Sequence, residues 1–291
     1  MDESIAQRVT AKISAMPASE RKVAQTLIAN FPLAGLKTVA EFSRDAGVSA
    51  PTVLRFLTRI GFQNYGAFQA ALKEELGARL QSPLARSERL GQPINGQTTS
   101  TFVRAVEENI AETLAHLGQA EIEATAALLG DKKRTVYLVG GRFTDPVARY
   151  AAAHLRIIRP RVVHLDGQES SWHDRLLDMT RADVLVLFDI RRYQPSLLRF
   201  AEAAVDRRVV VVLFTDQWLS PLSKLARHVF AAHTSVPSPW DSSAALFVLV
   251  ELLLARITEK SAPASVQRIR KMERLKPHES SAAAGGKPSS G

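Results

Sequence analysis

Apolar residues in the first part of the chain repeat at the spacing of an α-helix. They recur three or four positions apart, first as Ile5, Val9 and Ile13 and later as Val53, Phe56, Leu57 and Ile60. No run here alternates apolar and polar positions for long enough to form a strand. The pattern predicts an all-helical domain over residues 1–80.

The pattern changes twice along the rest of the chain. Residues 81–97 contain Pro, Gly and Asn without helical or strand periodicity and are predicted to form a linker. A predicted pair of helices follows at Thr101–His116 and Glu121–Leu129. After Gly130, short continuous apolar runs alternate with helical segments.

Those runs predict a parallel sheet, because strands that are apolar on both faces are buried between helical layers. The predicted strands are Thr135–Val139, Arg161–Leu165, Val184–Phe188, Val209–Phe214 and His228–Ala232. The predicted connecting helices are Pro146–Ile158, Ser196–Asp206, Pro221–Ala226 and Ser242–Ile257. Residues 98–259 are thus expected to form an α/β domain with a five-stranded parallel sheet, whose ligand site lies at the carboxyl ends of the strands.

Composition and charge narrow the class of protein. The chain has 291 residues and no cysteine, which excludes disulfides, thiolate zinc sites and cysteine nucleophiles. Its acidic N-terminus lacks the features of a signal peptide, and its longest apolar stretch, Ala244–Ala255, is too short to span a bilayer. We therefore expect a cytoplasmic protein without a membrane partner.

The net charge of +9 comes mainly from the two ends of the chain. Residues 1–80 carry 10 basic and 7 acidic side chains, residues 81–259 carry 21 and 20, and residues 260–291 carry 7 and 2. The last of these segments is predicted to hold a short basic helix at Val266–Lys276 and a disordered tail at 277–291. The charge alone is weak evidence for a nucleic-acid partner.

A stretch near Gly47 has the layout of a helix-turn-helix. One predicted helix ends at Ala46, and Gly47 can adopt the left-handed conformation that ends a helix. Ser49 is placed to cap the next helix, and Pro51 lies in its first turn, where a missing N–H costs little. In such pairs the second helix enters the major groove of DNA.

Helical spacing divides the second helix into two faces. Val53, Leu57 and Ile60 point inward, while Thr52, Arg55 and Arg59 are predicted to share the outer face. Arginine reads guanine or holds phosphate, and threonine contacts thymine methyl groups or phosphate. Ser49, Asn64 and Tyr65 are further candidates for DNA contacts. By spacing alone, an ordinary helical hairpin with a solvated polar face remains open.

The order of landmarks supports the DNA-binding interpretation. The segment MPASERKVAQTLIANF, followed by VAEFSRDAGVSAPTVLRFLTRIGFQNYGAFQAALKEEL, resembles the N-terminal domain of the RpiR/MurR family of bacterial transcriptional regulators. That family couples this domain to a SIS (sugar isomerase) domain that senses phosphorylated sugars. Residues 130–259 resemble a SIS domain in layout, and TDQWLSPLSKLARHVF resembles the segment that follows its fourth strand.

The ligand loops depart from the family pattern. Typical members carry a Ser-x-Ser-Gly-x-Thr loop after the third strand, whereas here the matching positions hold Asp189, Arg191, Arg192 and Gln194. The loss of hydroxyls and glycine removes a compact phosphate-binding nest, and Asp189 would repel a phosphate beside it. Arginines at these loops could still pair with a carboxylate or phosphate in another pose.

Two interpretations of this domain stay open. In the first it senses an anionic or polar metabolite through residues at the strand ends, namely Gly141, Arg142, Thr144, Asp189, Arg191, Arg192, Tyr193, Thr215, Asp216, Trp218, Trp240 and Asp241. In the second, Asp189 and the arginines pair with one another and the domain serves only for oligomerisation.

No pattern in the sequence predicts catalysis or a cofactor. The histidines show no metal-binding spacing, and Gly140-Gly141 lacks a dinucleotide fingerprint. Glu169 and His173 could act as bases in a sugar isomerase but are interpreted as solvated loop residues. The sequence predicts a dimeric or higher homo-oligomeric regulator that binds an operator in double-stranded DNA and responds to a small-molecule effector, without metal, cofactor or catalytic residue. The alternative is a phosphosugar isomerase with an appended helical domain.

Overall fold

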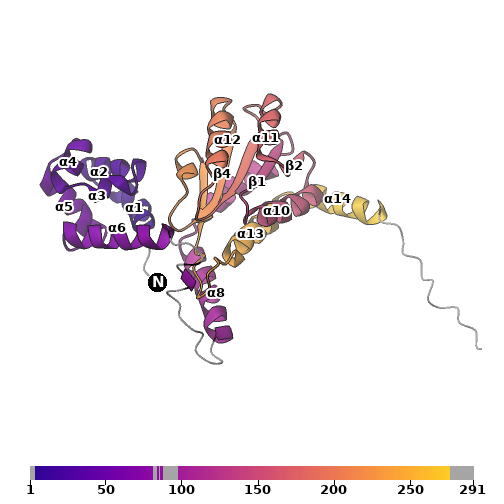
Figure 1. Ribbon diagram of the computed structural model, residues 1–291. Coiled ribbons are helices and arrows are strands. Elements are labelled where there is room, and N and C mark those ends of the chain that lie inside the picture. Colours follow the sequence, from indigo (N-terminus) through magenta and orange to yellow (C-terminus); the bar gives the residue numbers. More distant parts are fainter. Residues whose placement is uncertain (1–3, 81–83, 85, 88–97, 276–291) are drawn as a thin grey trace, which may run out of the picture.

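The computed structural model describes residues 4–80, 84, 86–87 and 98–275. A helical domain lies beside a larger domain in which helices cover a parallel sheet (Figure 1). The fold class predicted from the sequence is confirmed. Most of the predicted linker and the predicted tail at 277–291 lie outside the described residues.

Seven short helices form the N-terminal domain, namely α1 (Ile5–Lys12), η1 (Ile13–Ala15), α2 (Ala18–Ala29), α3 (Leu33–Leu36), α4 (Val39–Asp45), α5 (Ala50–Arg59) and α6 (Tyr65–Leu80). Their apolar faces meet in one core, in which Val23, Phe42, Phe56 and Phe68 are fully buried. At the start of α4, the Thr38 hydroxyl accepts a hydrogen bond from the amide of Glu41, and the Glu41 carboxylate accepts one from the amide of Thr38. This reciprocal capping holds the first helix of the predicted pair in place.

The larger domain alternates strands and helices as predicted. Its elements are α8 (Thr98–Ala115), α9 (Gln119–Gly130), β1 (Val136–Gly140), α10 (Asp145–Ile158), β2 (Val162–His164), α11 (Glu169–Trp172), η2 (His173–Leu177), β3 (Val184–Asp189), α12 (Pro195–Asp206), β4 (Val210–Asp216), η3 (Pro221–Lys224), β5 (His228–Ala232), α13 (Ala244–Lys260) and α14 (Ala262–Leu275). The predicted basic helix is the last of these. The segment predicted as a helix at Pro221–Ala226 is a 3-10 helix.

All neighbouring strands are parallel, in the order β2-β1-β3-β4-β5. Both faces are buried, because successive side chains of one strand point to opposite layers. Val186 and Phe188 pack with α9, α10 and α13, whereas Leu185 and Leu187 pack with η2 and α12. The register places the ends of β1 and β3 side by side, with Gly140 opposite Phe188.

The helical domain contacts the larger domain through α1 and the end of α2. The Ser4 hydroxyl donates to the carbonyl of Gln217 at 2.5 Å, and Lys224 Nζ donates to the carbonyl of Ala29. Gln7 Nε2 lies 3.3 Å from Nε2 of His233, which follows β5. The two domains therefore meet at the edge of the sheet that carries β4 and β5.

Candidate functional site

The connection between α4 and α5 has the geometry that the sequence predicts. Gly47 has φ +60°, and the amide of Val48 donates to the carbonyl of Ser43 at 3.0 Å. Pro51 lies in the first turn of α5, directly after its first residue, Ala50. A glycine in the left-handed conformation lets the chain turn within a few residues. The two helices thus form a compact pair with α5 as the second helix.

One side of α5 is buried and the other faces solvent. Val53, Phe56 and Leu57 are at most 1% exposed. The solvent side carries the exposed side chains of Pro51, Leu54, Arg55, Thr58 and Arg59. Leu54 is 44% exposed, so this surface offers an apolar side chain among its cations and hydroxyl. Leu54 and Thr58 were not among the predicted contacts, although helical spacing places both on this face.

The prediction that Thr52 shares the outer face is wrong. Its side chain is buried at 5% exposure, because it lies one helical turn before Phe56 and the buried stripe is wide enough to include it. The Thr52 hydroxyl lies 3.0 Å from the Ser49 hydroxyl and accepts a hydrogen bond of 3.0 Å from Arg55 Nη2. Ser49 begins the helix as predicted but makes no side-chain capping bond. Thr52 thus orients Arg55 from beneath.

Arg59 contacts another helix of its own domain. Its Nε donates to the Glu20 carboxylate at 2.6 Å, and the Glu20 side chain is 5% exposed. The hydrogen bond to Glu20 raises the pKa of Arg59 above its ordinary value. This ion pair ties α5 to α2, while the Arg59 side chain stays 43% exposed.

Asn64 and Tyr65 make structural contacts at the start of α6. Asn64 Oδ1 accepts a hydrogen bond of 2.8 Å from the amide of Ala67 and so caps the helix. The Tyr65 hydroxyl donates to the carbonyl of Lys37 at 2.8 Å. Burial, with a contribution from the Glu41 charge, raises the pKa of Tyr65 to about 12. A DNA contact by either residue remains a prediction, and both polar groups already have partners within the domain.

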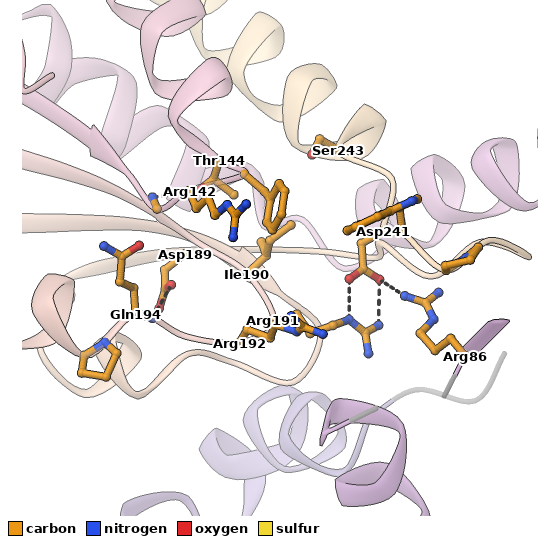
Figure 2. Close-up of a pocket in the computed structure, with 15 residues that line it drawn as sticks. Arg86, Arg142, Thr144, Asp189, Ile190, Arg191, Arg192, Gln194, Asp241 and Ser243 are labelled. Carbon is orange, nitrogen blue, oxygen red and sulfur yellow. Dashed lines mark hydrogen bonds and ion pairs between the residues drawn. The ribbon is translucent and has the colours of Figure 1, made fainter. Parts of the chain in front are cut away.

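A cavity of about 540 Å³ lies at the carboxyl ends of β1 and β3 (Figure 2). This is the edge of the sheet at which the sequence predicts a ligand site. The cavity is lined by Arg86, Gly141, Arg142, Phe143, Thr144, Asp189, Ile190, Arg191, Arg192, Gln194, Pro195, Pro239, Trp240, Asp241 and Ser243. Eight of the twelve predicted ligand residues are among them.

The loop after β1 is fixed by Thr144. Its hydroxyl donates to the carbonyl of Phe188 at 2.6 Å and accepts a bond of 2.9 Å from the amide of Gly141. A Cβ atom at Gly140 would come within 2.6 Å of the Thr144 carbonyl oxygen, so only glycine fits there. The Thr144 hydroxyl therefore joins the ends of the two strands.

In the loop after β3, a carboxylate of the chain itself lies at the start of α12. Asp189 accepts hydrogen bonds from the amide of Gln194, at 3.2 Å, and from the Ser220 hydroxyl. Arg191 and Arg192 have φ values of +39° and +20°, a region that side-chain-bearing residues rarely adopt. Helix N-termini attract anions, and here Asp189 supplies one.

Four predicted ligand residues do not line the cavity and instead support this loop. The carboxylate of Asp216 is fully buried and accepts bonds from the Tyr193 hydroxyl, at 2.7 Å, and from the amides of Arg191 and Trp218. Burial raises the pKa of Asp216. The Thr215 hydroxyl donates to the carbonyl of Asp189 at 2.8 Å. The polar residues that end β4 thus satisfy backbone groups of the neighbouring loop.

Arg191 pairs with Asp241, which comes from the segment before α13. Arg191 Nη2 donates to Asp241 Oδ1 at 2.8 Å, and the Trp218 ring lies 4.3 Å from the guanidinium. Arg86 Nη1 donates to the same Oδ1 at 3.0 Å, and its Nη2 donates to the carbonyl of Val236 at 3.2 Å (Figure 2). Arg86 lies in the segment that joins the two domains. Sequence periodicity gives no signal for its place in the cavity.

The mouth of the cavity is cationic and aromatic. Arg142 and Arg192 are both exposed. The rings of Phe143 and Trp240 lie 5.9 Å apart, and the Arg142 guanidinium lies 5.1 Å from the Phe143 ring. Phe143 was missed as a site residue, although an exposed aromatic beside a glycine pair is a signal of a contact surface. The arrangement can hold an anion between guanidinium groups and stack a flat or ring-shaped group nearby.

Glu169 and His173 do not converge on a reacting position. The Glu169 carboxylate accepts a bond from Gln194 Nε2, whereas the His173 ring lies against Phe200, 5.7 Å between centroids. Both side chains are exposed as expected, but they lie in α11 and η2 rather than in a loop. None of the described helices is long and apolar enough to cross a membrane.

Family models match both domains. The helix-turn-helix domain of the rpiR family matches residues 3–79, and the SIS domain matches residues 129–256. A Thermotoga maritima protein named as an HTH-type transcriptional regulator is 22% identical over 231 residues, which cover 79% of this chain and 81% of that protein. A similarly named Haemophilus influenzae protein is 22% identical over 228 residues, with 78% of each chain covered.

The chain also resembles one region of longer proteins. The bifunctional protein glk of Paraburkholderia xenovorans is 27% identical over 231 residues, which cover 77% of this chain but 34% of that protein. The chain therefore spans about a third of the length of the glk proteins that it matches. Nothing outside that region is carried over to this chain.

Solved structures support the fold. The sugar isomerase domain of an RpiR transcription factor from Sphaerobacter thermophilus aligns with TM-score 0.58 and 24% identity, over 62% of this chain and 99% of that one. The Vibrio vulnificus NanR protein complexed with ManNAc-6P aligns with TM-score 0.55 and 17% identity, over 93% of this chain and 97% of that one. The second alignment extends over both domains.

Proposed function

We propose that this chain, a transcriptional regulator that joins an rpiR-family helix-turn-helix domain to a SIS domain, binds operator DNA as a dimer. A small anionic metabolite is proposed to control this binding. The relatives named as regulators place the chain among transcriptional regulators rather than enzymes. The dimer, the contacts to DNA and the effector are our proposals. The observation that supports these proposals is that one chain has both an exposed surface on α5 and a cationic cavity, and that the segment between the domains helps to line this cavity.

On the DNA side, we assign the exposed face of α5 to the major groove. Arg55 and Arg59 supply cations, Thr58 supplies a hydroxyl, and Leu54 supplies an apolar contact for a thymine methyl group. Arg44 on the neighbouring α4 adds positive charge for phosphates, whereas Lys37 is paired with Asp45 at 2.6 Å. A single module makes few base contacts, so two copies on a roughly palindromic operator are expected.

The test of DNA binding is a salt series on the DNA upstream of the protein's own gene, with the full chain. Binding should weaken steeply as salt rises, since phosphate contacts release counterions. Arg55→Ala should cost about 1–3 kcal/mol of specific binding if Arg55 contacts a base. Arg149→Ala, on α10 of the larger domain, is the matched control. Absence of salt-sensitive binding would contradict the proposal.

For the effector, the loop chemistry supports an anion held by Arg142 and Arg192 rather than at the start of α12. A phosphate at the α12 N-terminus would meet the Asp189 carboxylate that already accepts the Gln194 amide. The NanR relative is complexed with a phosphorylated sugar derivative. We propose for this chain a carboxylate- or phosphate-bearing metabolite whose remaining part stacks on Phe143 and Trp240.

Coupling between effector and DNA is proposed to run through Asp241. This carboxylate joins Arg191 in the cavity to Arg86 in the segment between the domains. An effector anion held by Arg142 and Arg192 would lie next to Arg191 and compete with Asp241 for it, which would alter the hold of Asp241 on Arg86. The position of the helix-turn-helix domain would then depend on the occupancy of the cavity, provided that the ligand binds the two arrangements with different affinities.

A further inference from the structure

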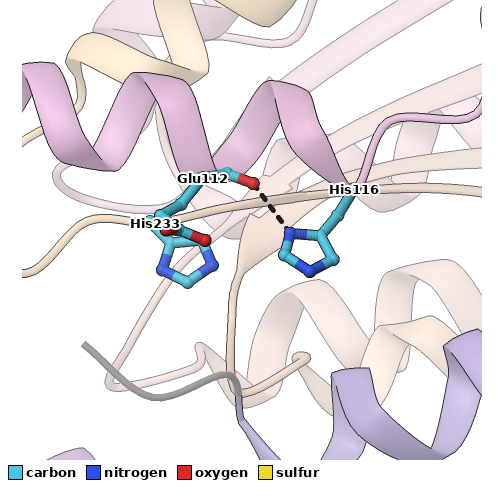
Figure 3. Close-up of side chains that lie close together, drawn as sticks. All are labelled: Glu112, His116 and His233. Carbon is cyan, nitrogen blue, oxygen red and sulfur yellow. Dashed lines mark hydrogen bonds between the residues drawn. The ribbon is translucent and has the colours of Figure 1, made fainter.

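Two histidines and a glutamate from distant parts of the chain lie together where the two domains meet. Glu112 lies in the last turn of α8, His116 directly follows the end of that helix, and His233 follows β5 (Figure 3). One ligand atom from each of the three lies within 4.8 Å of the other two. No pattern in the sequence predicts this group, because its members are distant in the chain and no spacing motif includes His233.

The ring of His116 is held with a defined tautomer. Its Nδ1 lies 2.8 Å from the backbone carbonyl oxygen of Glu112, which can only accept a hydrogen bond (Figure 3). Nδ1 therefore carries the hydrogen and Nε2 carries the lone pair. Metal-binding histidines commonly use one ring nitrogen in this way to fix the other as the ligand.

His233 is anchored to the same helix. Its backbone amide donates to the Thr113 hydroxyl at 2.9 Å, which fixes the loop after β5 against α8. The residue is 3% exposed, so its ring has little freedom to move.

We propose that Glu112, His116 and His233 bind a divalent transition-metal ion, with Zn²⁺ as the best-matched ion. Two imidazoles and one carboxylate are a common zinc donor set, with water in the fourth position. Ligand bonds of about 2.0–2.2 Å set the spacing that the three donor atoms must adopt around the ion. The exposed Glu112 side chain can reach that spacing by changing its rotamer, while His116 keeps its bond to the Glu112 carbonyl and buried His233 stays in place.

The ion would sit at the junction of the two domains. Gln7 of α1 in the helix-turn-helix domain donates from Nε2 to Nε2 of His233, 3.3 Å away, because an amide nitrogen can only donate. A metal ion on His233 would replace this hydrogen bond, since at Nε2 it needs the same lone pair and at Nδ1 it moves the ring hydrogen to Nε2. Bound metal would therefore fasten α8 to the end of β5 and release the contact of His233 with Gln7. The site lies away from the cavity of Figure 2 and shares no residue with it.

The test is metal binding by the full chain after treatment with a chelator. Titration with Zn²⁺ should show one tight site per chain, and Co²⁺ should give the intense visible absorption of a tetrahedral complex with nitrogen and oxygen ligands. His116→Gln and Glu112→Gln change exposed side chains and should each weaken Zn²⁺ binding by more than about tenfold. His154→Gln, an exposed histidine on α10, is the control and should bind as the unaltered chain does.

Equal Zn²⁺ affinity of the unaltered chain and the His116→Gln variant would overturn the proposal, as would Co²⁺ binding without the tetrahedral spectrum. His233→Gln tests the buried ligand, and its circular dichroism spectrum reports whether the variant folds. If it does not fold, the exposed pair decides. None of these measurements uses DNA or an effector, so the metal site can fail while the proposed regulatory function stands.

Discussion

The guanidinium of Arg191 forms a two-point ion pair with the carboxylate of Asp241, at 2.5 and 2.8 Å, across the floor of the cavity. Both side chains are largely buried, at 8% and 13% exposure. The same carboxylate accepts from Arg86, so one acid pairs with two arginines from separate parts of the chain. Because Asp241 contacts both the cavity and the segment between the domains, it can couple effector binding to DNA binding.

Asp241→Asn is expected to destabilise the larger domain and to increase its affinity for anions. The change leaves Arg191 and Arg86 without their shared carboxylate, and loss of one partner of a largely buried pair costs about 3 kcal/mol. Thermal unfolding measures the first effect, and titration with inorganic phosphate measures the second. Asp206→Asn, at the exposed end of α12, is the control. Unchanged stability together with unchanged anion affinity would contradict the role of Asp241.

Arg142→Ala and Arg192→Ala should each weaken binding of an anionic effector by about tenfold or more. A charge-assisted hydrogen bond to a carboxylate or phosphate contributes about 1.5–3 kcal/mol, and 1.4 kcal/mol corresponds to a factor of ten. Thermal shifts with a panel of sugar phosphates and small carboxylates measure the effect. Arg199→Ala on α12 is the matched control, because Arg199 is exposed and does not line the cavity. An effector that binds all three variants equally would place the anion elsewhere.

The fold was largely predictable because its elements have simple periodicity. Each predicted strand matches an observed one to within two residues, and His228–Ala232 matches β5 at both ends. Apolar runs buried on both faces leave little choice between fold classes. The short elements α11 and η2, after β2, were not predicted, because helices of four and five residues are too short to establish helical periodicity.

The site was predictable only where position along a strand decides it. Gly141 comes directly after β1 and Asp189 is the last residue of β3, and both line the cavity. Asp216 also ends a strand, yet it turns inward to bond the amide of Arg191, which no local pattern reveals. Likewise, Thr52 is buried because Phe56 widens the buried face of α5 until it includes Thr52.

Thr52→Val should weaken specific DNA binding without unfolding the helical domain. Valine keeps the shape of the buried side chain but removes the hydroxyl that accepts from Arg55. Loss of one hydrogen bond of this kind costs about 1 kcal/mol, which is a factor of about five in affinity. Fluorescence anisotropy with operator and unrelated DNA measures the change. An equal loss on both DNAs would show that Arg55 holds phosphate rather than a base.

Tyr65→Phe is expected to change the alkaline stability of the protein and to leave DNA affinity unchanged. The folded-state pKa of about 12 lies above the ordinary value of 10.0, so this phenol stabilises the fold fully below pH 10. That contribution is lost as pH rises from 10 toward 12. The variant lacks the bond to the Lys37 carbonyl, worth about 0.5–1.5 kcal/mol, and should show a smaller loss of stability over this range.

Urea unfolding between pH 8 and about 11 measures the difference between the two proteins. Tyr150→Phe is the control for DNA binding, because Tyr150 lies on α10 of the larger domain. If Tyr65→Phe bound operator more weakly while Tyr150→Phe bound it as the unaltered chain does, Tyr65 would contact DNA, as the sequence predicts.

Arg86→Gln should uncouple the effector from DNA while both bind. Arg86 ties the interdomain segment to Asp241 and to the carbonyl of Val236, so the substitution removes both of these contacts with the cavity. Coupling energies between sites are about 1–3 kcal/mol, or a factor of about 5–150 in affinity. In the unaltered chain, a saturating effector should change operator affinity within that range, and in the variant the change should fall below about twofold.

Because linkage is reciprocal, effector affinity measured with and without operator must show the same loss of coupling. A variant that keeps full coupling would show that the signal travels by another route, such as the contacts of Ser4 and Gln7 with the end of the sheet.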